Sequence, residues 1–136
     1  MTLDPYAPTP LSGADRSVAE RLGLLAVDCS WNRLGDRGRF PDATSGAGRR
    51  AHRRRLPILI ATNPQHYGRV AQLNTAEALA AALCVLGRSA EGAQLLAGIA
   101  GGDEFVPVNR ERLERYAAAR SAEEILAAER SLFGGG

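Results

Sequence analysis

Two short apolar runs, each followed at once by polar residues, constrain the fold of this chain most strongly. The first run, residues 24–27, ends at the segment 28–31, and the second, residues 56–61, ends at Thr62. Runs of this length between polar segments favour buried strands. Because ligands of α/β folds collect at the carboxyl ends of strands, the residues after each run are candidates for a binding site.

Helical patterns fill much of the remaining chain. Strands are expected over 24–28 and 56–62, and helices over 14–22, 75–87, 90–98, 109–119 and 122–132. The expected N-caps are Thr75, Asn109 and Ser121, and Gly87 is the expected stop of a helix that is apolar nearly all round and therefore buried. Strands mixed with several helices predict an α/β fold, in one domain over residues 1–133. Residues 1–13 are expected to be an extended segment, and the glycines at 134–136 a disordered tail.

Positive charge is concentrated in one stretch of the chain. Residues 33–55 contain eight Arg and two acidic residues, although the net charge of the whole chain is only +2. The region 32–55 lacks periodicity, which predicts a loop of unusual length. Its end is a basic cluster that indicates contact with nucleic-acid phosphate, with a solvated run of charge as the alternative. The candidate RNA-binding residues are Arg49, Arg50, Arg53, Arg54 and Arg55.

Asp28 and Trp31 are the candidate site residues after the first apolar run. Asp28 could cap the next turn, or it could accept hydrogen bonds from ligand hydroxyls. Trp31 is the single Trp of the chain and could be a core residue or part of a pocket wall. Their spacing of three residues after a strand favours the ligand interpretation for Asp28. In the loop after the second run, His66 alone is weak support for acid–base chemistry.

Several classes of protein are disfavoured by composition. Two cysteines outside any Cys-x-x-Cys pair, with only two His, predict no zinc site and two small buried residues, Cys29 and Cys84. No apolar run approaches the roughly 20 residues that span a bilayer, and no signal-peptide pattern is present, so a cytoplasmic location is expected. The segment 101–105 matches a diguanylate cyclase signature, but it lies between helical patterns and has no second acidic strand end.

The motifs of the chain, taken in order, resemble one family from about residue 3 to residue 125. They match the ribosomal RNA aminocarboxypropyltransferases of archaea and eukaryotes. The motifs are Leu3-Asp4-Pro5, Val27-Asp28-Cys29-Ser30-Trp31, Arg55-Leu56-Pro57, Ala61-Thr62-Asn63-Pro64, Tyr67-Gly68-Arg69, Leu73-Asn74 and Glu77-Ala78-Leu79-Ala80-Ala81-Ala82-Leu83.

This resemblance implies a fold, a cofactor and a substrate. The fold would be a SPOUT-like parallel sheet flanked by helices, with a C-terminal trefoil knot. The cofactor would be S-adenosyl-L-methionine (SAM), and no metal is implied. The reaction would transfer the 3-amino-3-carboxypropyl group to N3 of an N1-methylpseudouridine in small-subunit rRNA, or in its precursor particle, during ribosome biogenesis. The enzyme would act as a monomer.

The resemblance also implies roles for individual residues. Asp28 and Trp31 match the catalytic motif, in which the Trp shields the methyl group and the acid lies near the cofactor. The implied cofactor-binding residues are Ser12, Asp28, Trp31, Leu59, Leu73 and Asn74. Backbone amides after the Leu-Pro strand and near Leu73 and Asn74 would hold the adenine.

The chain departs from the family pattern at three places. Ala100 replaces a family Trp, and Gln65 and His66 replace other family residues. An N-terminal RNA-binding region of the family is expected to be missing, and the Arg-rich loop at 32–55 is expected to replace its surface. Two alternatives therefore stay open, a catalytically inactive relative that binds RNA or the ribosome, and a SAM-dependent transferase that acts on another substrate such as tRNA.

Overall fold

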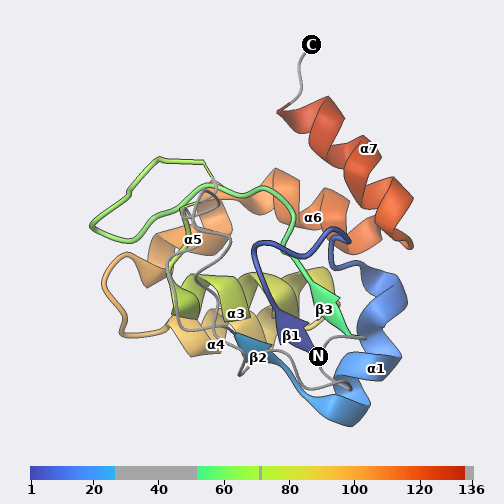
Figure 1. Ribbon diagram of the computed structural model, residues 1–136. Helices are drawn as coiled ribbons and strands as arrows, with labels where there is room; N and C mark the ends of the chain where they lie inside the picture. The colour runs from blue at the N-terminus through green and yellow to red at the C-terminus, as the bar shows by residue number, and fades with distance from the viewer. Residues whose placement is uncertain (27–51, 71, 134–136) are drawn as a thin grey trace.

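A small parallel sheet lies at the N-terminal side of the molecule. The computed structural model describes residues 1–26, 52–70 and 72–133. In these residues, β1 (Thr2–Leu3) pairs in parallel with β2 (Leu25–Ala26) on one side and β3 (Arg53–Arg54) on the other, in the order β2-β1-β3. Figure 1 shows the three strands side by side, with the N-terminus at the start of the central one.

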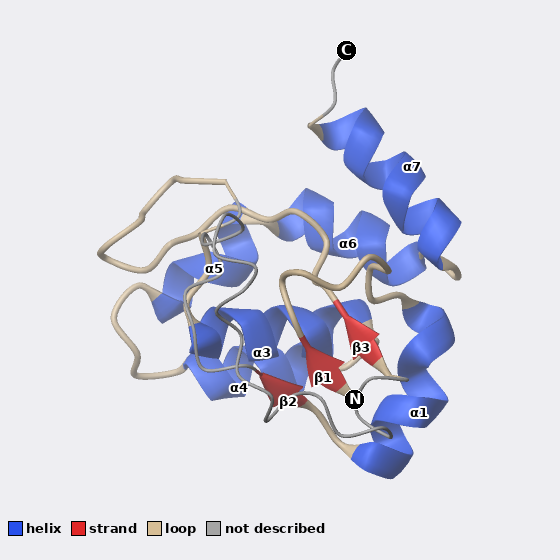
Figure 2. Ribbon diagram, in the orientation of Figure 1, coloured by secondary structure: helices blue, strands red, loops and turns tan. Residues whose placement is uncertain are grey.

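Helices form most of the rest of the described chain, as Figure 2 shows. Their bounds are 3₁₀ helix η1 (Gly13–Asp15), α1 (Arg16–Leu22), α3 (Thr75–Val85), α4 (Ser89–Leu96), α5 (Gly102–Val108), α6 (Arg110–Ala118) and α7 (Ala122–Leu132). The five helical regions expected from the sequence are confirmed. The sequence analysis missed α5, because glycine before it and Pro107 within it weaken the local helical signal.

Helix α3 is the best example of a locally encoded element. It is largely buried, as expected, and Cys84 is a buried residue within it with 3% exposure. It ends before Gly87, whose φ of +90° gives the left-handed stop. Its N-cap is Asn74 rather than Thr75, because the Asn74 side chain accepts a hydrogen bond from the backbone N–H of Glu77. That expected cap was therefore wrong by one residue.

The other two expected caps have different outcomes. Ser121 caps α7 as expected, with its hydroxyl accepting a hydrogen bond from the backbone N–H of Glu124. Asn109 occupies the N-cap position of α6, but its side chain makes no capping hydrogen bond. Its side chain bonds to the backbone of Ile60 instead.

The strands differ from expectation at both ends of the sheet. Residues 1–13 contain the central strand, β1, where only an extended segment was expected, and Leu3 is fully buried there. The first apolar run forms β2 only at Leu25–Ala26, and its residues 27 and 28 lie outside the described part. Leu25 is 46% exposed, so the expectation of a buried strand was wrong at that residue. The reason is that β2 lies at the edge of the sheet that the described residues form, where it pairs with β1.

The second apolar run, residues 56–62, is extended but does not form a strand, which corrects the prediction made for it. The strand lies just before it, at Arg53–Arg54, so the predicted loop 32–55 also ended too late. Isolated bridges join Arg55 to Pro10 and Ile60 to Val70. Most of the backbone hydrogen bonds of the run go instead to helix side chains, which no strand pattern can signal.

One cluster of buried apolar residues extends from β1 to α7 and includes Leu3, Leu59, Val85, Phe105 and Ile125. Helix α3 packs against α4, α6 and β2. Figure 1 shows α3 and α4 behind the strands, and α7 above α6. The apolar run 56–62 (green in Figure 1) runs from β3 past α6 toward α5.

Candidate functional site

Hydrogen bonds from side chains of the helices hold the backbone of the segment 56–62 in place. Glu129 of α7 accepts a hydrogen bond from Ile58 N at 2.9 Å, and Tyr116 of α6 donates its hydroxyl to Ile58 O at 2.7 Å. Asn109 accepts from Ile60 N at 2.8 Å and donates to Ile60 O at 2.9 Å. Burial raises the pKa of Tyr116, and the nearby charge of Glu129 adds to this shift, so its phenol stays protonated.

Leu59, a predicted cofactor residue, lies between these two anchored residues. It is fully buried. In an extended chain the polar backbone groups of neighbouring residues point to opposite sides, so those of Leu59 point away from the helices that hold Ile58 and Ile60. Within the described residues, the N–H and C=O of Leu59 have no hydrogen-bond partner. Buried backbone groups normally have one, so these two groups are suited to binding a ligand.

Leu73 and Asn74, also predicted cofactor residues, lie directly before α3. Leu73 is 4% exposed, and its backbone N–H and C=O likewise have no partner among the residues that the structure covers. Asn74 is already hydrogen-bonded to Glu77. Its backbone N–H donates to Glu77 Oε1 at 3.0 Å, and its side-chain oxygen accepts from Glu77 N at 2.8 Å. The backbone groups of Leu73 are therefore suited to binding a ligand, while Asn74 holds Leu73 at the helix start.

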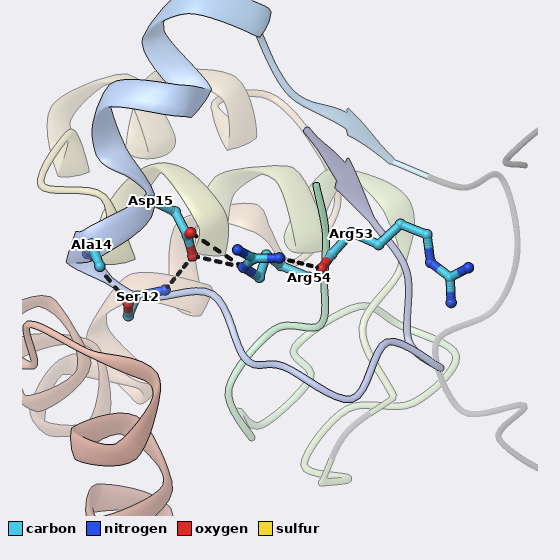
Figure 3. A network of polar contacts seen from close by, with 5 residues as sticks. All are labelled: Ser12, Ala14, Asp15, Arg53 and Arg54. Atoms are coloured by element: carbon cyan, nitrogen blue, oxygen red, sulfur yellow. Dashed lines mark hydrogen bonds and ion pairs between the residues drawn. The ribbon is translucent and has the colours of Figure 1, made fainter. Parts of the chain in front are cut away.

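Ser12, another predicted cofactor residue, is the N-cap of η1 and is 2% exposed. Its Oγ accepts a hydrogen bond from Ala14 N, and its backbone N–H donates to Asp15 Oδ2, both at 3.2 Å. Figure 3 shows this capping box beside Arg54. In the described part of the chain, no hydrogen bond joins Ser12 to Leu59 or Leu73.

Arg54 and Arg55, predicted to bind RNA, are paired inside the fold. Arg54 Nε lies 3.2 Å from both carboxylate oxygens of Asp15 (Figure 3). Arg55 makes a bidentate pair with Glu129, with both distances 2.9 Å. The partner carboxylates are only 10% and 8% exposed. Arg54 therefore connects β3 to η1, and Arg55, which follows β3, connects it to α7. The partner carboxylates balance the positive charge of both arginines.

Arg53 is the most exposed of the three consecutive arginines. Its side chain is 30% exposed, and its Nε lies 3.0 Å from Asp4 Oδ2. Figure 3 shows it pointing away from Arg54, as expected for neighbours in a strand. The remaining predicted site residues, Asp28, Trp31, Arg49 and Arg50, lie outside the described residues.

Sequence reasoning assigned no role to Glu77, which the structure places beside the predicted cofactor residues. Glu77 is 2% exposed, and its carboxylate accepts hydrogen bonds from Thr62, Asn63 and Asn74. A usable signal was present, because Asn74 followed three residues later by Glu77 before an apolar run is a capping-box pattern. Placing the cap at Thr75 concealed that pattern.

Two further properties concern the described part of the chain. None of its helices is both long enough and apolar enough to cross a membrane. It also contains no group of three or more His, Cys, Asp or Glu side chains placed to hold a metal ion.

The described residues form an α/β domain with a parallel sheet and buried backbone groups that make a candidate site, and comparisons with known proteins place the chain in a family. The family model described as "Ribosome biogenesis protein, C-terminal" matches residues 1–133. A 16S rRNA aminocarboxypropyltransferase of Vulcanisaeta distributa is 43% identical over 97% of this chain and 66% of its own length. Another, of Methanopyrus kandleri, is 41% identical over 93% of this chain and 71% of its own length.

A solved structure agrees with these matches. The SAM-dependent rRNA:acp-transferase from Vulcanisaeta distributa superposes with a TM-score of 0.78 at 42% identity, over 98% of this chain and 67% of that one. The chain belongs to the 16S rRNA aminocarboxypropyltransferase family, which confirms the resemblance found in the sequence. It spans about two thirds of the length of its Vulcanisaeta relative.

Proposed function

We propose that this chain is a SAM-dependent transferase that modifies small-subunit rRNA during ribosome biogenesis. The group transferred is 3-amino-3-carboxypropyl, and the acceptor is N3 of an N1-methylpseudouridine. The observation that carries this proposal is the match to the Vulcanisaeta rRNA:acp-transferase structure at 42% identity over 98% of the chain. We propose further that residues 1–133 form one SPOUT-like domain with a C-terminal knot, which acts as a cytoplasmic monomer.

The backbone groups at Leu59 and Leu73 fit the cofactor. Adenine presents an amino donor next to a ring-nitrogen acceptor, and a peptide unit offers the matching C=O and N–H. Both residues are buried and both lack hydrogen-bond partners in the described chain. When bound, SAM supplies an electrophilic carbon attached to a sulfonium sulfur. Asn74 keeps Leu73 in place, and Ser12 is proposed to contact the ribose or the amino-acid tail.

Asp28 and Trp31 are proposed to choose which group is transferred. A sulfonium has three carbons open to attack, and the reacting carbon is the one that is presented in line to the nucleophile. We assign Trp31 to cover the methyl group and Asp28 to orient the cofactor. An acid near a positive sulfonium stabilises the ground state as well as the transition state, so Asp28 is a binding residue more than a source of rate.

Binding of rRNA is proposed for the basic cluster, with unequal shares. Arg53 is the most exposed of its described members, and we group it with Arg49 and Arg50 as contacts to phosphate. Arg54 and Arg55 are 23% exposed and hold internal carboxylates, so their contribution to RNA binding is smaller.

The deciding experiment compares the products formed from SAM. Transfer of the aminocarboxypropyl group leaves 5′-methylthioadenosine, whereas transfer of the methyl group leaves S-adenosylhomocysteine. The purified chain is incubated with SAM and small-subunit rRNA that carries the N1-methylpseudouridine, and both products are measured by chromatography. Calorimetric titration with SAM accompanies it, for the unaltered chain and for Asp28→Ala.

We expect methylthioadenosine as the product and loss of SAM binding in Asp28→Ala. Trp31→Ala should lose SAM affinity or release S-adenosylhomocysteine. RNA binding without SAM binding would contradict the proposal and support a catalytically inactive relative. SAM binding with a product formed only on tRNA would support the proposed group transfer and contradict the proposed rRNA substrate.

A further inference from the structure

Glu77 carries more hydrogen bonds than a helix cap requires. Its Oε1 accepts from Asn63 Nδ2 at 2.7 Å and from Asn74 N at 3.0 Å. Its Oε2 lies 2.8 Å from Thr62 N and 3.0 Å from Thr62 Oγ1. The capping box of α3 explains the contact with Asn74 alone. The contacts with Thr62 and Asn63 join α3 to a segment that is distant in sequence, and that connection needs another explanation.

These contacts link the two segments whose backbone groups lack partners within residues 1–26, 52–70 and 72–133. Thr62 ends the segment that contains Leu59, Asn63 follows it, and Asn74 follows Leu73. Asn63 adds a direct connection, because its Nδ2 also lies 3.2 Å from the carbonyl oxygen of Gln72. Thr62, Asn63 and Glu77 are all at most 3% exposed, so water does not compete with these bonds.

Gly101 holds Thr62 from the opposite side. Thr62 Oγ1 lies 2.9 Å from the carbonyl oxygen of Gly101. A Cβ atom at Gly101 would lie 2.1 Å from the carbonyl oxygen of Thr62, and the φ of Gly101 is +78°. Thr62 is therefore enclosed between the first turn of α3 and the start of α5, which leaves it little freedom to shift.

We propose that Glu77 is a positioning residue for the cofactor. Its carboxylate sets the distance between the backbone of Leu59 and that of Leu73, so that both can contact one adenine. The inference rests on the proposed function, and it adds a residue that touches neither the cofactor nor the RNA. It requires a carboxylate, because a backbone N–H faces each oxygen, from Asn74 on one side and from Thr62 on the other, so the amide of a Gln would turn its own N–H groups toward a donor in either orientation.

The test compares Glu77→Gln with the matched control Glu124→Gln. Glu124 is also the third residue of its helix and also accepts a backbone N–H, from Arg120 at 2.7 Å, but it is exposed and its contacts are with residues at the start of its own helix. We expect Glu77→Gln to raise the Kd of SAM roughly tenfold or more, since misplaced donors disturb both backbone contacts. The kcat at saturating SAM should stay within about twofold, because adenine binding is shared by ground and transition states. Glu124→Gln should bind SAM as the unaltered chain does.

A second variant separates positioning from loss of folding. Thr62→Val removes the hydroxyl and leaves the side-chain volume nearly unchanged. Circular dichroism with thermal unfolding reports whether each variant is folded. A folded Glu77→Gln or Thr62→Val protein that binds SAM with unchanged Kd would overturn the inference. So would equal losses in kcat and in kcat/KM. If the unaltered chain itself does not bind SAM, the proposed function fails first and the inference fails with it.

Discussion

Asn109→Leu tests whether side chains of the helices replace strand pairing for the segment 56–62. Asn109 is fully buried, and its side chain makes three hydrogen bonds, with both backbone groups of Ile60 and with Phe105 O. Leu has nearly the same volume, so the substitution removes these bonds without a large cavity. Phe105 O keeps the hydrogen bond from the backbone N–H of Asn109 at 3.1 Å, so only the two groups of Ile60 lose their partners.

The magnitude follows from those two groups. An unsatisfied buried polar group costs about 1–3 kcal/mol, and Ile60 is only partly buried, so about 1–2 kcal/mol for each is appropriate. We expect Asn109→Leu to lower the free energy of unfolding by about 2–4 kcal/mol. This is a large share of the roughly 5–15 kcal/mol that stabilises a typical domain.

Urea unfolding followed by circular dichroism measures this change, with the m-value checked for a constant unfolded state. Arg110→Ala is the control, because Arg110 is the exposed neighbour of Asn109 at the same helix start and should cost under about 0.5 kcal/mol. Asn109→Ala should cost at least as much as Asn109→Leu, since it adds a cavity. A loss below about 1 kcal/mol for Asn109→Leu would show that the segment is held by apolar packing, and the reasoning would be refuted.

Three further predictions follow from contacts in the structure. Burial raises the pKa of Tyr116, so the unfolded chain loses this proton at lower pH than the folded one, and stability should fall as pH rises above about 10; Tyr116→Phe should remove that fall in urea midpoints measured across this range. Gly101→Ala should lower the free energy of unfolding by about 2–5 kcal/mol, because the new Cβ would overlap Thr62 O and the backbone would be strained. Gly68→Ala, with φ +83° and open space around it, should cost about 1–2 kcal/mol from strain alone, and similar losses for the two variants in urea unfolding would exclude the overlap. Arg53→Ala should reduce the slope of log affinity for RNA against log salt concentration by about 1, whereas Arg54→Ala should mainly reduce stability, by about 1–2 kcal/mol. Filter binding at several salt concentrations and unfolding curves measure the two effects, and equal behaviour of the two variants would contradict the prediction.

The helices could be predicted from the sequence because their signals are local. Helix α7 begins after Ser121 and α3 ends before Gly87, and both boundaries depend on neighbours within one turn. The family was also identifiable, since its motifs are short runs such as Leu73-Asn74 that keep their order along the chain. The α/β class was predicted from these helices together with the two apolar runs interpreted as strands.

The strands and the charge pairs depended on contacts between distant residues. Thr2–Leu3 is a strand because residues near 25 and 53 lie on either side of it, and the residues next to it in sequence do not encode this pairing. The run 56–62 has the composition of a strand, yet side chains of α6 and α7 occupy its backbone groups.

The sequence by itself determined the helices other than α5, the α/β class and the family, because each rests on residues close together in the chain. Only the tertiary structure decided which polar groups are already paired. It showed that Arg54 and Arg55 neutralise internal carboxylates, that Asn74 is used as a cap, and that the backbone groups of Leu59 and Leu73 have no partner among the described residues. Pairing depends on which distant segments the fold brings within hydrogen-bonding distance, and a buried polar group accepts whichever partner that geometry supplies.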